Sequence, residues 1–137
     1  GRSVFYAALL LPHFNKICGI EIISELTSAS EDLRQLYSAE VASTLPGHYG
    51  QQEISFIDGD ILQVDWSDAD FVLANSTCFT PQLMTAMEVR AEQMMRSGSV
   101  IVTLTHPFKD QTKWELLGSL DRRQSWGPAV MYVQRRI

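Results

Sequence analysis

The sequence has 137 residues, enough for one domain with a hydrophobic core, and we expect a single domain over residues 1–137. Apolar residues make up 45% of it and charged residues 20%, which excludes a disordered, collagen-like or coiled-coil chain. The net charge of −5 argues against a broad basic face, so we expect no direct nucleic-acid binding by this segment. No apolar run approaches the roughly twenty residues of a membrane span, and we expect no membrane contact.

The residues that serve as metal ligands or nucleophiles are scattered along the sequence. Cys18 and Cys78 stand sixty positions apart, with no histidine at ligand spacing, so we expect no metal site. His13, His48 and His106 lie in unrelated segments. Their spacing assembles no nucleophile-and-base arrangement, which disfavours hydrolytic triad chemistry.

Hydrophobic periodicity divides the sequence into alternating helices and strands. The expected elements are a helix over 2–11, a strand over 16–23, a helix from 28 or 30 to about 45, strands over 54–57 and 70–74, a helix over 81–97, and strands over 99–105, 114–120 and 129–135. Helices cease where the last strands begin. We therefore predict an α/β fold: an open, mostly parallel sheet covered on both faces, with an antiparallel strand pair at its C-terminal end.

Two of the expected helices have recognisable start signals. Thr80 and Pro81 are a good cap and first helical residue, an apolar stripe follows, and Gly98 supplies the stop. For the helix before it, Ser28 or Ser30 can act as the cap. The apolar stripe expected on that earlier helix comprises Leu33, Leu36, Tyr37 and Val41.

Polar residues lie within or directly after three of the predicted strands. Glu21 stands twenty positions after Gly1, which is the spacing at which dinucleotide- and nucleoside-binding folds place the acid that accepts ribose hydroxyls. Asp60 can accept from an adenine amine and Asn75 offers an amide at the end of the next strand. The alternatives are a solvent-facing strand-end acid, a turn aspartate and a helix-entry asparagine. Since ligands of such sheets bind at the carboxyl ends of strands, the three positions together predict a binding site.

The sequence resembles the seven-strand, S-adenosylmethionine-dependent methyltransferases, and more narrowly the disruptor-of-telomeric-silencing family of non-SET histone lysine methyltransferases. The matching segments are Gly1 with the helix that follows it, 19–21, 59–61, 75–81, 96–102, 125–126 and 128–132. The resemblance implies a Rossmann-like sheet of seven strands in three layers, with S-adenosyl-L-methionine as the cofactor.

The resemblance also assigns cofactor contacts. Gly1 would be the last glycine of the glycine-rich loop near the methionine part of the cofactor. Glu21 would hold the ribose, while Asp60 and Ile61 would hold the adenine. Phe79 would help to wall the cofactor, and Asn75 would lie between cofactor and substrate.

On the acceptor side, the resemblance implies that Trp126 lines a channel through which a lysine side chain reaches the methyl group, and that Asn75 orients the amine. The family usually has an aromatic residue at Ile61, an asparagine at Ser76 and an aromatic residue at Thr77, so the channel of this chain differs. The function implied is methyl transfer to a protein lysine on a core histone.

Several further expectations follow from the resemblance. Contacts with a nucleosome would come from regions outside this chain, and the protein would be nuclear, with a cytoplasmic location as the alternative. Other functions left open are methyl transfer to a non-histone protein or a small molecule, and a non-catalytic cofactor- or partner-binding module; a nicotinamide dehydrogenase is disfavoured. Because a complete sheet of this kind starts with a strand ahead of Gly1, we expect that first strand to be missing from the chain. It would lie between the strands that end at Glu21 and Asn75.

Overall fold

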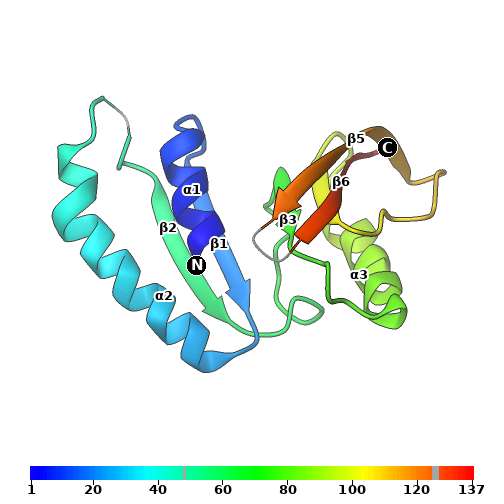
Figure 1. The fold of residues 1–137 in the computed structure, drawn as a ribbon, viewed down its shortest axis with the longest axis horizontal. Coiled ribbons are helices and arrows are strands. Elements are labelled where there is room, and N and C mark those ends of the chain that lie inside the picture. The colour runs from blue at the N-terminus through cyan, green and yellow to red at the C-terminus, as the bar shows by residue number, and fades with distance from the viewer. Residues whose placement is uncertain (48, 125–126) are drawn as a thin grey trace. The chain divides into compact units, whose positions relative to one another are not determined.

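The computed structural model describes residues 1–47, 49–124 and 127–137. They form two compact units, unit 1 (Gly1–Val64) and unit 2 (Asp65–Ile137), shown in Figure 1. Unit 1 carries eight acidic and three basic side chains, whereas unit 2 carries eight of each, so the whole net charge of −5 lies in unit 1. No helix in the described part of the chain is long and apolar enough to cross a membrane.

Unit 1 is built on a two-stranded parallel sheet. Its elements are α1 (Arg2–Leu10), β1 (Lys16–Glu21), α2 (Ser24–Leu36), a π-helical turn (Tyr37–Val41), a 3-10 turn (Ala42–Thr44) and β2 (Glu53–Asp58). The register runs from the pair Lys16 and Glu53 to the pair Glu21 and Asp58, so both strands end at the same edge. A parallel pair needs a crossover connection, and α2 provides it.

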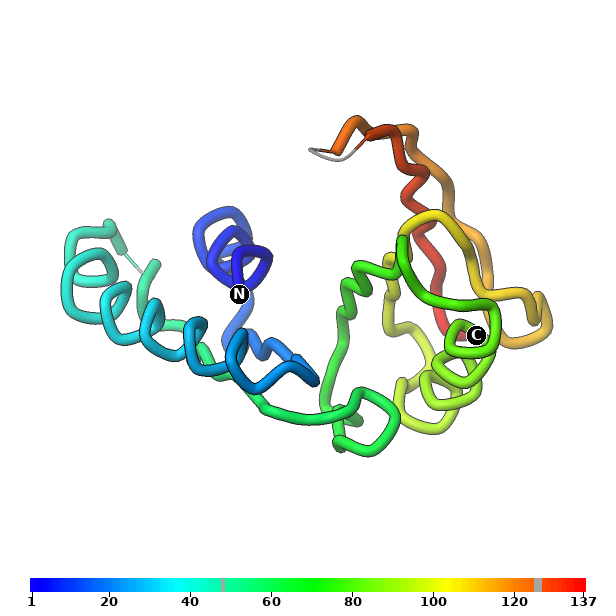
Figure 2. The backbone as a smooth tube through the Cα atoms, turned by 60° about the horizontal axis from the view of Figure 1, so that its bottom comes forward, coloured from blue at the N-terminus to red at the C-terminus, as the bar shows by residue number. Residues whose placement is uncertain are grey.

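Both helices of unit 1 pack on one face of this sheet. Val4 and Ala8 of α1 are buried together with Ile17 of β1, and Phe56 of β2 packs against the same cluster. Gly19 makes this packing possible, since a Cβ atom there would lie 2.8 Å from the Phe56 ring. Figure 2 shows α1 and α2 running beside the two strands.

The start of α2 differs from the sequence-based expectation. The helix begins at Ser24, where Oε1 of Glu21 accepts a hydrogen bond from the N–H of Ile23 at 3.1 Å. Ser30, one of the two expected caps, lies inside the helix, is buried, and donates to the carbonyl of Leu26 at 2.7 Å. The expected cap position was wrong because the helix begins earlier, with Ile23 as its N-cap residue and no side chain accepting a capping hydrogen bond, so both serines lie inside it.

The apolar stripe expected on this helix is also only partly buried. Tyr37 is 8% exposed and belongs to the core of unit 1, whereas Leu33 and Leu36 are 49% and 54% exposed. The π-helical turn that starts at Tyr37 does not account for the exposure of Leu33 and Leu36, but it changes the angular spacing of the residues after it. Val41 is consequently exposed as well.

Unit 2 contains a four-stranded mixed sheet. Its elements are β3 (Phe71–Ala74), α3 (Pro81–Met94), β4 (Val100–Leu104), β5 (Trp114–Gln124) and β6 (Gly127–Arg136). The strand order is β3-β4-β6-β5, with β3 and β4 parallel and the other two pairs antiparallel. The expected antiparallel strand pair at the C-terminal end is confirmed.

Helix α3 begins as its sequence signals predicted, but it ends at Met94, with Met95 as its C-cap, before the expected stop at Gly98. The Thr80 side chain accepts a hydrogen bond from the N–H of Leu83 at 3.2 Å, and Pro81 is the first helical residue. Gly98 follows the helix with a φ of +90°, a conformation that favours glycine. The apolar stripe is buried at Met84, Met87, Ala91 and Met95.

A buried glutamine fixes the loop between β4 and β5. Gln134 of β6 is 3% exposed, accepts from the N–H of Phe108 at 2.8 Å and donates to its carbonyl at 3.0 Å. The amide thus satisfies both backbone groups of Phe108, as a strand partner would. This holds Phe108 against the ring of Trp114, with ring centroids 5.0 Å apart.

The α/β fold class and the mixed sheet are confirmed, whereas a seven-stranded sheet is not. The described residues contain six strands, which hydrogen-bond as two separate sheets, β1-β2 and β3-β4-β6-β5. The three-layer arrangement, the missing first strand and the assignment of one domain remain predictions.

Candidate functional site

The carboxyl end of the sheet in unit 1 carries two of the expected acidic residues. Glu21 is the last residue of β1, and its backbone carbonyl accepts a hydrogen bond from the N–H of Gly59 at 2.9 Å. This bond joins β1 to the loop that carries Asp60 and Ile61. The Glu21 carboxylate lies at the amino end of α2, where the backbone N–H groups and the helix dipole favour negative charge.

Asp60 shapes its own loop. Its Oδ1 accepts a hydrogen bond from the N–H of Leu62 at 2.8 Å, and its carbonyl accepts from the N–H groups of Gln63 and Val64. This is an aspartate turn, one of the alternatives that the sequence left open. Ile61 follows Asp60 and is half-buried. The turn holds the loop against the end of β1 and is compatible with a ligand contact from the same carboxylate.

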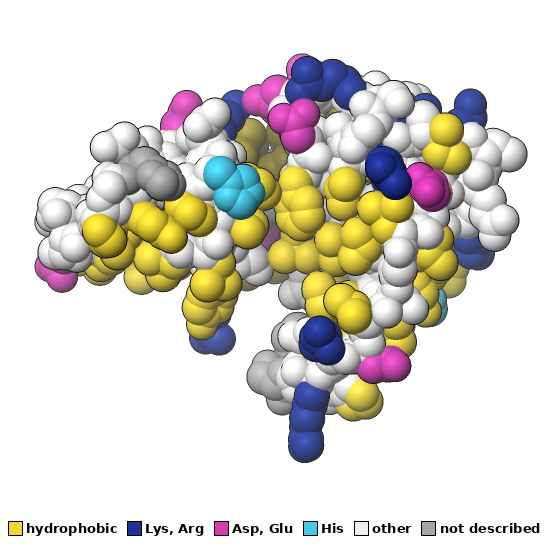
Figure 3. Space-filling model, turned by 90° about the horizontal axis from the view of Figure 1, so that it is seen from above, with side chains coloured by type: hydrophobic (Ala, Val, Ile, Leu, Met, Phe, Trp, Pro, Cys, Tyr) yellow, Lys and Arg dark blue, Asp and Glu magenta, His cyan; other side chains and the backbone are white. Residues whose placement is uncertain are grey.

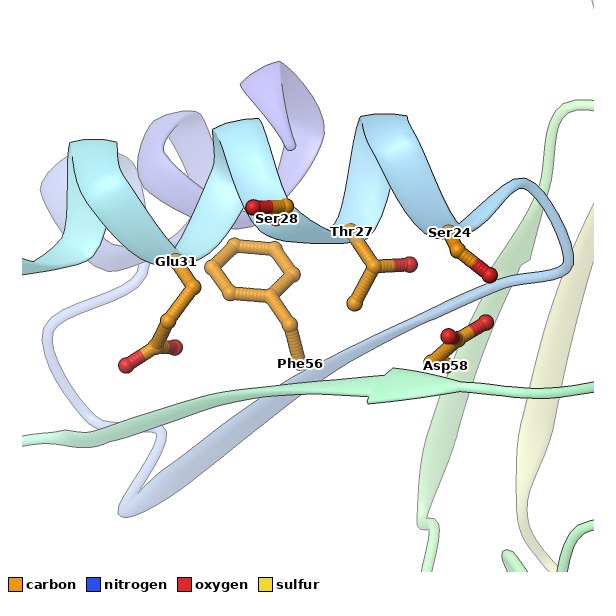
Figure 4. A pocket seen from close by; sticks show the side chains of 6 residues that line it. All are labelled: Ser24, Thr27, Ser28, Glu31, Phe56 and Asp58. Carbon is orange, nitrogen blue, oxygen red and sulfur yellow. The ribbon is translucent and has the colours of Figure 1, made fainter.

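A groove of about 360 Å³ runs between α2 and β2 in unit 1 (Figure 4). Three hydroxyls and Glu31 line it from α2, at positions 24, 27, 28 and 31, and Phe56 and Asp58 line it from β2. Arg34 forms an ion pair with Glu31, and the hydrogen bond and charge of its guanidinium lower the pKa of that carboxyl. The groove therefore combines polar hydroxyls and carboxylates with one aromatic surface.

Sequence reasoning did not identify the residues of this groove. Their signal was the spacing of four polar residues at i, i+3, i+4 and i+7, which places them on one helix face. The expected helix began too late in the sequence for Ser24 and Thr27 to be seen as part of it.

The corresponding edge of unit 2 is held together by Ser76. Ser76 is fully buried, and its hydroxyl donates to the carbonyl of Leu104 at 2.8 Å and accepts from the N–H of Leu104 at 2.9 Å. Asn75, the expected contact between cofactor and substrate, directly precedes it and is exposed. Phe79 is half-buried, and its N–H donates to the carbonyl of Ser76 at 3.0 Å. These hydrogen bonds thus connect the segment after β3 to the C-terminal end of β4.

The residue directly after β4 has a strained backbone conformation. Thr105 has a φ of +72°, which is unusual for a β-branched residue, and its N–H donates to Val130 of β6 at 2.8 Å. The next residue, His106, donates its N–H to the carbonyl of Leu104 at 2.9 Å. Such strain is common near functional sites.

The structure therefore places the expected site residues in two groups. Gly1, Glu21, Asp60 and Ile61 belong to unit 1, where a Cβ atom at Gly1 would lie 2.7 Å from the hydroxyl oxygen of a serine on α2. Asn75 and Phe79 belong to unit 2.

The described residues do not include one expected site residue, and they contain no metal-binding group. Trp126, expected to line the lysine channel, lies outside the described residues. No group of metal-ligating side chains occurs in the ranges 1–47, 49–124 and 127–137.

Comparison with known proteins connects this chain to one fold. No protein-family model matches the sequence, and no curated protein matches it significantly. An RNA methyltransferase from Salinibacter ruber, solved with S-adenosyl-L-homocysteine, superposes with a TM-score of 0.70 at 18% identity, over 99% of this chain and 74% of its own. The fold is that of a methyltransferase.

Two further solved methyltransferases support the same assignment of fold. The N-methyltransferase NodS from Bradyrhizobium japonicum, also solved with S-adenosyl-L-homocysteine, gives a TM-score of 0.65 at 16% identity, over 98% of this chain and 73% of its own. An S-adenosylmethionine-dependent methyltransferase from Methanosarcina mazei gives 0.68 at 10% identity, over 98% and 86%. At these identities the likeness concerns the fold alone.

Proposed function

We propose that this chain is the core of an S-adenosyl-L-methionine-dependent methyltransferase. The observation that carries the proposal is the Glu21 carboxylate, which ends β1 beside the amino end of α2 in a methyltransferase fold. Two of the similar structures hold S-adenosyl-L-homocysteine, the product of such a cofactor.

The residues of unit 1 fit the nucleoside part of this cofactor. A carboxylate has two oxygens that can accept both hydroxyls of a ribose, which suits Glu21. The loop bonded to Glu21 carries Asp60, which can accept from the adenine amine, and Ile61, which offers an apolar surface to the ring. Gly1 would contact the methionine part, and Phe79 would wall the cofactor.

The cofactor supplies an electrophilic methyl group on a sulfonium. The acceptor must therefore present a neutral nucleophile in line with the sulfur–methyl bond, and the chief task of the chain is to position it. Asn75 can orient an amine through its side-chain carbonyl, although an amide does not take up a proton at neutral pH. A free lysine has a pKa of about 10.4, and removal of water around it favours the neutral amine. Trp126 would provide such an apolar wall.

For the acceptor, we propose a lysine of a core histone. The resemblance of 75–81 and 125–126 to the disruptor-of-telomeric-silencing family supports this choice, as does the charge of unit 1. With eight acidic and three basic side chains, that unit attracts basic polypeptides such as histones. A histone acceptor implies a nuclear location and nucleosome contacts made by other regions. Methyl transfer to another protein, to RNA or to a small molecule would be the competing outcome of the acceptor test.

We also propose that β3 takes another parallel strand, as the seventh strand expected from the sequence. One edge of β3 pairs with β4, and no strand among the described residues pairs with the other. Phe71 and Leu73 on β3 are 41% and 45% exposed, although parallel strands are normally buried. Amide hydrogen exchange of 71–74 is expected to slow when that strand is present, and unchanged exchange would contradict the proposal.

Calorimetric titration with S-adenosyl-L-homocysteine tests the cofactor. We expect binding by the wild type, loss of at least about tenfold in affinity for Glu21→Gln because the bonds to the ribose weaken, and no change for Glu25→Gln, an exposed acid in the first turn of the same helix. Binding of NAD instead would overturn the assignment, and binding of neither compound would favour a non-catalytic module.

Transfer of a labelled methyl group tests the acceptor. Nucleosomes, free histones, RNA and bulk protein are offered separately to the wild type and to Asn75→Ala. We expect labelling of histones, and a lower kcat for the variant because its acceptor is less well oriented. Labelling of only another substrate would refute the histone assignment without touching the cofactor assignment, and full turnover by Asn75→Ala would refute the role of Asn75.

A further inference from the structure

Strand β5 is a long edge strand with an open side. It has eleven residues, and among the described residues it pairs only with β6. Edge strands of natural proteins are usually short, charged or covered, because their unpaired N–H and C=O groups recruit other strands. β5 carries charges at Glu115, Asp121, Arg122 and Arg123, but it is long, and its open side can accept another strand.

The side chains of β5 support the same conclusion. Leu116, Leu117 and Leu120 are 55%, 44% and 46% exposed, near the middle of the strand. Hydrophobic side chains reach the surface on both units (Figure 3), but here they lie on a strand whose backbone is also open on one side. Apolar side chains flanked by charges at both ends are typical of an interface.

The charges on β5 are arranged for an antiparallel copy of the same strand. Acidic Glu115 lies before the leucines, and acidic Asp121 and basic Arg122 and Arg123 lie after them. Asp121 pairs with Val130 and so points to the face opposite that of Arg122, which pairs with Ala129. In an antiparallel pair of copies whose two-fold axis passes through the Ser119 pair, Glu115 of one copy faces Arg122 of the other, and the contact occurs twice. Opposite charges directly across a strand pair stabilise it.

The bulge in β5 makes this pairing geometrically consistent. A two-fold axis perpendicular to a sheet keeps each side chain on its face, so Glu115 and Arg122 must share one face. Seven positions separate them, which in a regular strand would put them on opposite faces. The register shift between Leu116 and Gly118 corrects this, because Glu115 pairs with Arg135 and Arg122 pairs with Ala129, six positions apart on β6.

We propose that two copies of this chain associate through β5, edge to edge and antiparallel, with Glu115 of each copy paired to Arg122 of the other. Leu120 lies on the same face, since it pairs with Met131, and the two Leu120 side chains meet near the axis. The four-stranded sheets of the two copies then form one continuous sheet of eight strands.

Light scattering after size-exclusion chromatography tests the dimer, run over a range of protein concentrations and at low and high salt. The monomer mass is 15.4 kDa, and we expect twice that value for the wild type and for Arg122→Lys. Arg122→Glu faces Glu115 with a like charge at both contacts, and we expect its dimer dissociation constant to rise about ten- to a hundredfold. Leu120→Lys should give a monomer because it places two ammonium groups near the axis.

The matched control is Arg96→Glu, which makes the same change in net charge at an exposed residue outside β5. We expect it to remain a dimer, and far-UV circular dichroism checks that each variant is folded. A wild type that stays monomeric at every concentration would overturn the proposal, as would an Arg122→Glu variant that dimerises as tightly as the wild type. Failure of the cofactor titration would leave this result unaffected.

Discussion

Replacing Ser76 by alanine should loosen the edge of the sheet that carries Asn75. The hydroxyl of Ser76 bonds both the N–H and the carbonyl of Leu104, and Ser76 is fully buried. Thr105, the next residue, donates its N–H to Val130 of β6, so the alternation of β4 turns the backbone groups of Leu104 toward β3. Because β3 ends at Ala74, the side chain of Ser76 replaces the strand there.

The two backbone groups of Leu104 lose different amounts in this variant. Its carbonyl keeps the N–H of His106 as a donor, at 2.9 Å, and loses one of two bonds. Its N–H loses the hydroxyl, and a buried donor without a partner costs about 1–3 kcal/mol, whereas the lost bond at the carbonyl costs about 0.5–1.5 kcal/mol. We therefore expect Ser76→Ala to lower the free energy of unfolding by about 2–4 kcal/mol, out of the roughly 5–15 kcal/mol that domains usually have.

Urea unfolding followed by tryptophan fluorescence and circular dichroism measures this loss. Ser97→Ala, at an exposed position of the same unit, is the matched control and should change the unfolding free energy by less than about 0.5 kcal/mol. If Ser76→Ala were as stable as this control, the hydroxyl would not be bridging the two strand ends.

Two further predictions concern a glycine and a carboxylate. Gly50→Ala should lower the free energy of unfolding by about 2–4 kcal/mol, because φ is +79° and the new Cβ would lie 2.5 Å from a backbone oxygen. Gly98→Ala should lower it by only about 1 kcal/mol, because φ is +90° but the new Cβ would enter open space. Urea unfolding measures both losses, and equal losses would contradict the steric argument. Hydrogen bonds from the side chain and backbone of Thr112 lower the pKa of Asp110, so its carboxylate stabilises the fold above the usual aspartate pKa and this contribution disappears as pH falls through the lowered value. The difference in unfolding free energy between wild type and Asp110→Asn should thus be present at neutral pH and vanish in acid, and a difference independent of pH would refute it.

Local sequence signals were sufficient where the physical cause is local. The cap at Thr80 and the first-turn Pro81 act within the first turn of helix α3, and the structure has both as expected, whereas the helix ends at Met94, before Gly98. The strands were found for the same reason, since a run of β-branched residues such as 100–102 satisfies a local preference.

The start of α2 and the groove beside it could not be found in this way. The helix begins at Ser24 after the N-cap residue Ile23, and no capping side chain marks its start in the sequence. Where no side chain caps the first turn, tertiary packing decides where a helix begins. Once Ser24 begins the helix, the hydroxyls at 24, 27 and 28 fall on the face toward β2.

The sequence by itself determined the alternation of helices and strands, the antiparallel finish and the position of Asn75 after a strand, because these depend on periodicity and chain order. Only the tertiary structure revealed the bond from Ser76 to Leu104, twenty-eight positions away, the amide of Gln134 that holds Phe108, and the bulge that brings Glu115 and Arg122 to one face of β5. Such contacts depend on which strands become neighbours and in what register, and that is settled by the packing of the whole unit rather than by any short stretch of sequence.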